Sequence, residues 1–157
     1  TAGLDVVAVQ DEPTCVAGLF ELDKAAVVDV GGGTTGTAVV QKGEVVFSGD
    51  EPSGGRHITL SISGHFNIPY HEAEQRKYQH DKYGILNLAR PTLQRICDIV
   101  ARHIKGHDVE KVVLTGGTCC LKDIETVFQA ELGLPVMLPS QPLLLTPLAI
   151  ATLCQVS

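Results

Sequence analysis

One buried strand and the glycines after it limit the fold more than any other part of the sequence. Ala25–Val30 (AAVVDV) is an apolar, β-branched run, which predicts a strand that is covered on both faces and central in its sheet. Gly31–Gly33 follow, and two further apolar segments, Gly36–Gln41 and Glu44–Ser48, are separated by Lys-Gly, as in a hairpin. The loop lacks the Gly-Lys-Ser/Thr of a Walker A motif, and it leads to a strand, whereas a dinucleotide fingerprint leads to a helix. We therefore expect a glycine loop between two antiparallel strands of a three-strand meander.

This glycine loop has the composition of a phosphate site. Glycines allow φ values that side chains forbid and let backbone N–H groups approach a ligand closely, so Gly31–Gly33 can form a nest for phosphate oxygens. Asp29, at the end of the strand, can hold Mg²⁺ through its coordinated waters, and Thr34 can donate to a terminal phosphate. The loop alone leaves open the alternative of a glycine-rich hairpin turn without a ligand.

Two weaker signals lie further along the chain. Gly116–Thr118 follows an apolar run and precedes a helix, and a glycine pair there lets a flat base or ribose lie on the backbone. A simple strand-to-helix turn is the alternative. Glu74 and Lys77, spaced i and i+3, can bracket ribose hydroxyls or an adenine edge, although most such pairs are exposed salt bridges.

Between residues 49 and 106 the pattern indicates helices. Apolar residues recur at helical spacing from Ile58 to Phe66, Pro69 begins a second helix, and Thr92–Ile104 has a 3.6-residue period. We expect a helical subdomain here, and an α/β core formed by residues 1–48 and 107–157. The other expected elements are a strand at Leu4–Val9, a helix from Pro13 to Leu22, a strand at Lys111–Thr115, a helix at Leu121–Leu132, a strand at Pro135–Leu138 and a helix at Thr146–Cys154.

Length and charge exclude several classes of protein. A chain of 157 residues has the size of one domain, and 44% hydrophobic against 19% charged residues is typical of a folded protein. The net charge is −6 and no stretch concentrates Lys and Arg, which argues against broad binding to nucleic acid or to an anionic membrane. The apolar run Pro142–Leu153 is too short to span a membrane, and no signal peptide is visible. We therefore expect a cytoplasmic protein with neither nucleic acid nor membrane as a partner.

The cysteines and histidines indicate neither a disulfide framework nor a zinc site. The five cysteines are odd in number and show no Cys-x-x-Cys spacing, so we expect free thiols. The six histidines are scattered, and none has ligand spacing from a second His or a Cys.

Taken in order, the motifs resemble the second lobe of the actin-like ATPases, which include the seventy-kilodalton heat-shock chaperones. The resemblance implies ATP and Mg²⁺ as ligands. It places Glu12 in the first connecting motif, the glycine loop in the second phosphate loop, and Gly55 near the ribose. It also places Glu74 and Lys77 at the adenosine. The candidate binding residues are Glu12, Asp29, Gly31, Gly32, Gly33, Thr34, Thr35, Gly55, Glu74, Lys77, Gly116, Gly117 and Thr118, with Asp29 also facing Mg²⁺ through water.

A closer resemblance covers essentially the whole chain. Five segments are similar in sequence to actin-like proteins of bacterial ethanolamine utilization: Asp11–Thr14, Val27–Gly36, His71–Gln75, Ile99–Ile104 and Thr146–Ala151. This implies ATP or ADP as ligand. It also implies client proteins, either the lyase or microcompartment proteins of ethanolamine utilization, and a cytoplasmic location associated with a bacterial microcompartment.

The resemblance also implies a partner lobe. Family members have an earlier lobe with its own Asp-x-Gly-Thr loop, and nothing before Asp29 is similar to it. We therefore expect an N-terminal lobe of the same protein as a partner, and ATPase activity only in its presence.

The expected fold is α/β: a ribonuclease-H-like, actin-like ATPase lobe with a mixed sheet flanked by helices and a small helical insertion. Two other functions stay open. One is a small-molecule kinase of the same superfold, in which Asp11 or an aspartate of the other lobe is the base. The other is a scaffolding protein with no nucleotide turnover.

Overall fold

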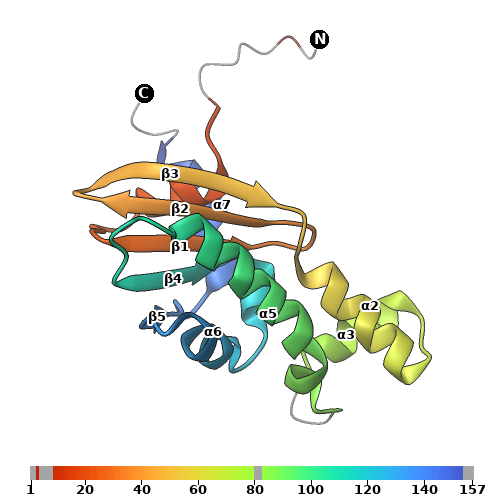
Figure 1. Ribbon diagram of the computed structural model, residues 1–157. Coiled ribbons are helices and arrows are strands. Elements are labelled where there is room, and N and C mark those ends of the chain that lie inside the picture. Colours follow the sequence, from red (N-terminus) through yellow and green to blue (C-terminus); the bar gives the residue numbers. More distant parts are fainter. Residues whose placement is uncertain (1–2, 4–8, 80–82, 154–157) are drawn as a thin grey trace.

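A five-stranded mixed sheet organises the chain (Figure 1). The structure is a computed structural model that describes residues 3, 9–79 and 83–153. β1 (Ala25–Val30), β2 (Thr35–Gln41) and β3 (Glu44–Glu51) form the expected antiparallel meander. β4 (Lys111–Thr115) pairs in parallel with β1, and β5 (Val136–Met137) pairs in parallel with β4. The strand order β3-β2-β1-β4-β5 confirms that the apolar strand β1 is central.

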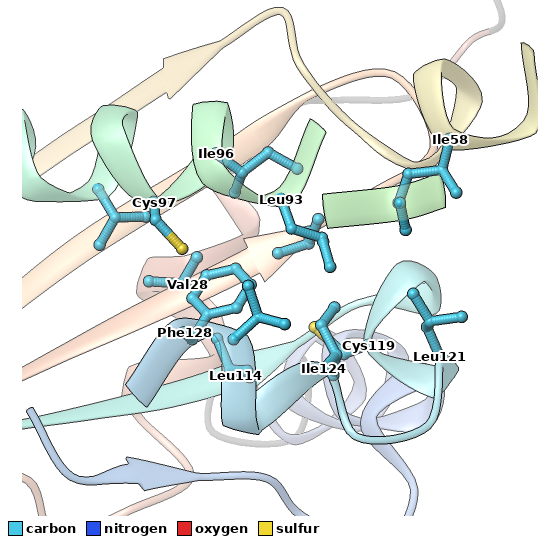
Figure 2. Packing of buried hydrophobic residues seen from close by; sticks show 14 of the residues in the cluster. Val28, Ile58, Leu93, Ile96, Cys97, Leu114, Cys119, Leu121, Ile124 and Phe128 are labelled. Carbon is cyan, nitrogen blue, oxygen red and sulfur yellow. The ribbon is translucent and has the colours of Figure 1, made fainter. Parts of the chain in front are cut away.

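The main core lies on one face of the sheet. Alternate residues of a strand point to opposite faces, and every second residue of β1, from Ala26 to Val30, packs toward α5 (Ile85–Ile104) and α6 (Ile124–Leu132). Figure 1 shows α5 crossing in front of the sheet. Figure 2 shows Leu93 of α5 and Phe128 of α6 among the buried side chains of this core.

A smaller core covers the opposite face. Ala25 and Val27 of β1 pack there with α1 (Glu12–Ala17) and with Ala149 of α7 (Pro142–Leu153). All six residues of β1 are buried because helices cover both faces, as the sequence predicts.

The segment between β3 and β4 is helical, as expected. It contains α2 (Gly55–Phe66), α3 (Tyr70–Lys77) and α5. The prediction that α5 begins at Thr92 is wrong by seven residues, because Ile85 and Ala89 are also fully buried and the helix continues past Pro91 to include them. Residues of α5 share the main core with the sheet, and the division of the chain into a core and a subdomain at 49–106 stays a prediction.

Three other predicted helix limits are wrong. α1 ends at Ala17, before Gly18, and does not reach Leu22. After β4 the chain forms a 3₁₀ helix, η1 (Gly117–Cys120), and α6 starts only at Ile124, because Asp123 has a left-handed backbone with φ 59°. α7 starts at Pro142 and not at Thr146, since proline needs no N–H partner at the first helical position.

Two further expectations concern an N-terminal strand and membrane-spanning helices. The strand expected at Leu4–Val9 lies outside the described residues except for Val9, which is in neither a helix nor a strand. Within the described ranges, no helix is long and apolar enough to cross a membrane.

Candidate functional site

Three glycine segments that are far apart in the sequence meet at one edge of the sheet. The carboxyl ends of β1 and β4 lie side by side because these strands are parallel neighbours, which brings Gly31–Thr34 next to Gly116–Thr118. The Gly31 carbonyl accepts a hydrogen bond from the Thr118 hydroxyl at 2.8 Å and another from the Gly55 N–H at 3.0 Å. The N–H of Arg56 donates to the Gly32 carbonyl at 2.7 Å. The start of α2 is therefore fastened to the first glycine loop.

Glycine is required where these segments touch. Gly116 has φ 93°, and a Cβ atom there would lie 2.6 Å from the Val30 carbonyl oxygen and in contact with the Asp29 carboxylate. A Cβ on Gly54 would lie 2.6 Å from the Gly31 carbonyl oxygen, and one on Gly55 would collide with the Thr118 hydroxyl. The contacts explain the glycines at 54, 55 and 116 without reference to a ligand.

The first glycine loop differs from the expectation. None of Gly31–Gly33 has a positive φ, so the prediction that this loop needs backbone angles forbidden to side chains is wrong. A Cβ on Gly32 or Gly33 would meet no atom within 4 Å. Among the described residues, no hydrogen bond uses the N–H of Gly32 or Gly33. These glycines therefore border open space and present free donors to it.

Asp29 is buried at the end of β1, with 5% of its surface exposed. Its Oδ2 accepts a hydrogen bond from the Thr146 hydroxyl of α7 at 2.7 Å. Burial raises the pKa of Asp29 above its ordinary value, the Thr146 bond lowers it, and the negative charge of Asp50 raises it further. The carboxylate is thus held by one donor in a place that disfavours its charge.

An acidic cavity opens beside Asp29. It has a volume of about 370 Å³, and four carboxylates stand on its wall together with the loop residue Thr34. Partial burial raises the pKa of Glu12, and the charges of Asp29 and Asp50 raise it further. The lining residues are Asp11, Glu12, Pro13, Asp29, Thr34, Gly36, Ser48, Gly49 and Asp50. No Lys or Arg is among them, so an anion enters this cavity only with a cation.

The carboxylates do not form a direct metal cage. Within the described part of the chain, no group of three or more His, Cys, Asp or Glu side chains is arranged to hold a metal ion. A site in which Mg²⁺ keeps its waters and meets Asp29 through them fits this arrangement, because Mg²⁺ gives up water reluctantly and often binds one or two carboxylates plus phosphate.

Asp11 has a structural role that weakens the kinase alternative. Its Oδ1 accepts a hydrogen bond from the Thr14 N–H at 3.0 Å and so caps the start of α1. A carboxylate that is occupied as a helix cap is a poor candidate for the base of a kinase.

Lys77 is buried and pairs with Glu74, whose side chain is 38% exposed, so the pair is not the fully exposed salt bridge of the alternative interpretation. Lys77 is 3% exposed, and its ammonium donates to Glu74 Oε1 at 2.7 Å and to the Thr59 hydroxyl at 3.1 Å. Burial acts to raise the pKa of Glu74, but the bonds from Lys77 and Thr59 and the charge of Lys77 outweigh it and lower this pKa. The ammonium also approaches the Gly55 carbonyl at 3.5 Å, so the pair supports the first turn of α2.

Two predicted site residues point away from the open space. Thr35 is fully buried, and its hydroxyl donates to the Ser53 carbonyl at 2.7 Å. The Thr118 hydroxyl is engaged with Gly31. Their side chains hold the loops together, and contact with a ligand would come from the loop backbone.

Sequence reasoning missed three residues of this region. Thr59 bonds both members of the Glu74–Lys77 pair, and Thr146 bonds Asp29. Tyr78 donates from its hydroxyl to the Gly117 carbonyl at 3.4 Å, with its ring under the Lys77 ammonium. Its position directly after Lys77 was the only signal of this contact, and no local signal marked Thr59 or Thr146.

The sequence matches the family model described as type IV pilus assembly protein PilM over residues 19–145, which is most of the chain. The chain belongs to the PilM family. The chain is also similar to the ethanolamine utilization protein EutJ of Escherichia coli (strain K12), with 46% identity over 97% of this chain and 55% of the relative. It therefore spans about half the length of the curated relatives that it matches.

Solved structures show the same fold. The crystal structure of EutJ from Carboxydothermus hydrogenoformans superposes with a TM-score of 0.82 at 38% identity, over 90% of this chain and 54% of that one. MreB5 of Spiroplasma citri bound to AMPPNP superposes with a TM-score of 0.82 at 18% identity, over 98% of this chain and 61% of that one. These matches confirm the actin-like ATPase fold and the resemblance to ethanolamine-utilization proteins.

Proposed function

We propose that this chain is the nucleotide-binding lobe of an actin-fold, chaperone-related protein of bacterial ethanolamine utilization. It binds ATP or ADP together with Mg²⁺, and an N-terminal lobe completes the site from the other side. The observation that carries the proposal is the meeting of the loops at Gly31–Thr34 and Gly116–Thr118 beside the acidic cavity.

The open backbone of the first loop supports a phosphate ligand. The free N–H groups of Gly32 and Gly33 border space that no side chain fills, which suits phosphate oxygens. Gly117, which is partly exposed at the start of η1 beside the neighbouring strand end, is where the backbone of the second loop would contact the nucleoside. MreB5 of Spiroplasma citri, which has the same fold, was solved with AMPPNP.

The charge of the cavity makes Mg²⁺ a requirement. Four carboxylates repel a nucleotide phosphate, and the described wall carries no Lys or Arg to offset them. Asp29 would hold a hydrated Mg²⁺, whose charge would offset part of this repulsion. Hydrolysis needs groups on both sides of the phosphates, since phosphoryl transfer depends on positioning and charge stabilisation. This lobe by itself therefore binds nucleotide weakly and does not hydrolyse it.

Calorimetry with the 157-residue chain tests the binding. We expect ADP and ATP to bind with Mg²⁺ and at least tenfold more weakly without it. Asp29→Asn should remove most of the Mg²⁺-dependent gain. Asp108→Asn, which removes an exposed carboxylate that is paired with Lys24 at 3.0 Å, is the matched control and should bind as the wild type does. Absence of binding by the wild type in Mg²⁺ would contradict the proposal and favour the scaffolding alternative.

The client is proposed from the relatives named for ethanolamine utilization. The lyase and the microcompartment proteins of that pathway are the candidates, and the protein acts beside them in the cytoplasm. Co-purification from cells grown on ethanolamine should recover one of these proteins, in an amount that differs between ADP and ATP. Equal recovery of unrelated proteins would argue against a specific client.

A further inference from the structure

We propose that Thr146 is a positioning residue for Asp29: its hydroxyl sets the orientation of the carboxylate that receives hydrated Mg²⁺. This inference rests on the proposed function. Thr146 lies on α7, 117 positions from Asp29 in the sequence, and the 2.7 Å bond between them joins a helix to the end of the central strand.

The hydrogen bonds of the first turn of α7 explain why this hydroxyl is available. Inside a helix, a threonine hydroxyl commonly bonds to the carbonyl four residues earlier, as Thr152 does with Leu148 at 2.9 Å. For Thr146 that carbonyl belongs to Pro142. It already accepts from the Gly116 N–H and from the Thr115 hydroxyl, each at 3.1 Å. The Thr146 hydroxyl therefore donates outward, to Asp29.

Gly116 leaves the space that the other oxygen of Asp29 occupies. The Asp29 Oδ1 lies so close to Gly116 that a Cβ there would collide with it, and Oδ2 is held by Thr146. A carboxylate that is buried and held at Oδ2 by one donor loses less rotational freedom than a free one when a hydrated cation binds. Bonds of this kind, from residues that do not touch the metal themselves, orient ligands in metal sites.

The arrangement also links the two loops of the site. Through Pro142 the start of α7 contacts the Gly116 loop, and one turn later, through Thr146, it contacts the aspartate beside the glycine loop. The register of α7 thus sets the position of Asp29 relative to the second loop. A purely structural role for Thr146 would instead affect stability and leave Mg²⁺ binding unchanged.

Three variants separate these roles. Thr146→Val removes the hydroxyl at nearly constant shape, and Thr146→Ser restores it. Thr152→Val removes a hydroxyl of the same helix that bonds to the Leu148 carbonyl. ADP affinity is measured by calorimetry with and without Mg²⁺. The pKa of the Asp29 carboxyl is followed by NMR in the nucleotide-free chain, and a thermal melt shows that each variant is folded.

We expect Thr146→Val to reduce the Mg²⁺-dependent gain in ADP affinity about tenfold, the effect of one hydrogen bond to a charged group. It should also raise the pKa of Asp29, because a donor to the carboxylate is lost. Thr146→Ser and Thr152→Val should behave as the wild type. An unchanged Mg²⁺-dependent gain in Thr146→Val would overturn the inference while the proposed function stands. If the wild type binds no nucleotide, the proposed function fails and the inference falls with it.

Discussion

Replacing Lys77 by methionine should destabilise the folded chain by about 2 kcal/mol. Lys77 is 3% exposed and joins Glu74, Thr59 and the Gly55 carbonyl. Removing one partner of a buried ion pair costs about 3–5 kcal/mol, because the remaining charge is left without compensation. The Glu74 side chain, however, is 38% exposed, so water can solvate it when the ammonium is gone. We therefore place the cost below that range. For a chain of this size it corresponds to a fall in Tm of roughly 4–8 °C.

Urea unfolding followed by circular dichroism at pH 7 measures this cost. Arg102→Met is the matched control: its guanidinium also binds a carboxylate, that of Glu51 at 2.9 Å, but the side chain is 58% exposed, so the loss should stay below about 1 kcal/mol. The double variant Glu74→Gln, Lys77→Met should recover part of the stability, since it leaves no unpaired carboxylate. A single variant as stable as the wild type, or a double variant no better than the single one, would refute the reasoning.

Three more predictions follow from the site and the core. Gly116→Ala should lower the free energy of unfolding by about 3 kcal/mol, because Gly116 has a positive φ and a Cβ there would collide with the Val30 carbonyl. Gly32→Ala should change it by less than about 0.5 kcal/mol and yet weaken Mg²⁺-ADP binding. Urea unfolding measures the stability and calorimetry the binding. Asp29→Asn should be more stable than the wild type at pH 7, because the folded-state pKa of Asp29 is raised and its charged form opposes folding. In pH-dependent melts, the difference in stability between the variant and the wild type should shrink as pH falls through that pKa and vanish below pH 3.8. Ellman's reagent should modify exposed Cys120 quickly and buried Cys97 slowly, since burial raises the pKa of Cys97 to about 12. Cys120→Ser should therefore remove one equivalent of fast-reacting thiol, and an unchanged number of fast-reacting thiols in this variant would contradict the prediction.

The sheet could be predicted from local patterns. The run AAVVDV is apolar at every position except Asp29, which is typical of a central strand covered on both faces. The Lys-Gly between the next two strands has the left-handed backbone of a hairpin at both residues. The helix limits could not be predicted as well. Pro91 and Pro147 both lie inside helices, where the burial of distant partners outweighs the local preference of proline.

The glycines of the site were predicted as a group but not for the right reasons. The spacing of glycines after two strands indicated two loops, and parallel pairing then brings such loops together. Whether a position requires glycine depends on the neighbouring backbone. Gly116 is required, because a Cβ there would collide with the Val30 carbonyl, whereas a Cβ on Gly32 would meet no atom within 4 Å. Contacts of Thr146 and Tyr78 with the loops depend on tertiary packing over 117 and 39 positions of sequence, and no local pattern encodes them.

The parallel pair at the centre of the sheet also determines the order in which the chain can fold. β1, β2 and β3 are consecutive and can pair as soon as they are made, but β4 arrives much later: Lys24, just before β1, bonds to Glu110, 86 positions along the chain. During synthesis at 5–20 residues per second, the edge of β1 that β4 will cover waits roughly 4–16 s while about 80 residues are added between Val30 and Lys111. An unpaired apolar strand edge accepts wrong partners readily. The newly made chain is therefore most exposed to aggregation in this interval, before its own fourth strand has left the ribosome.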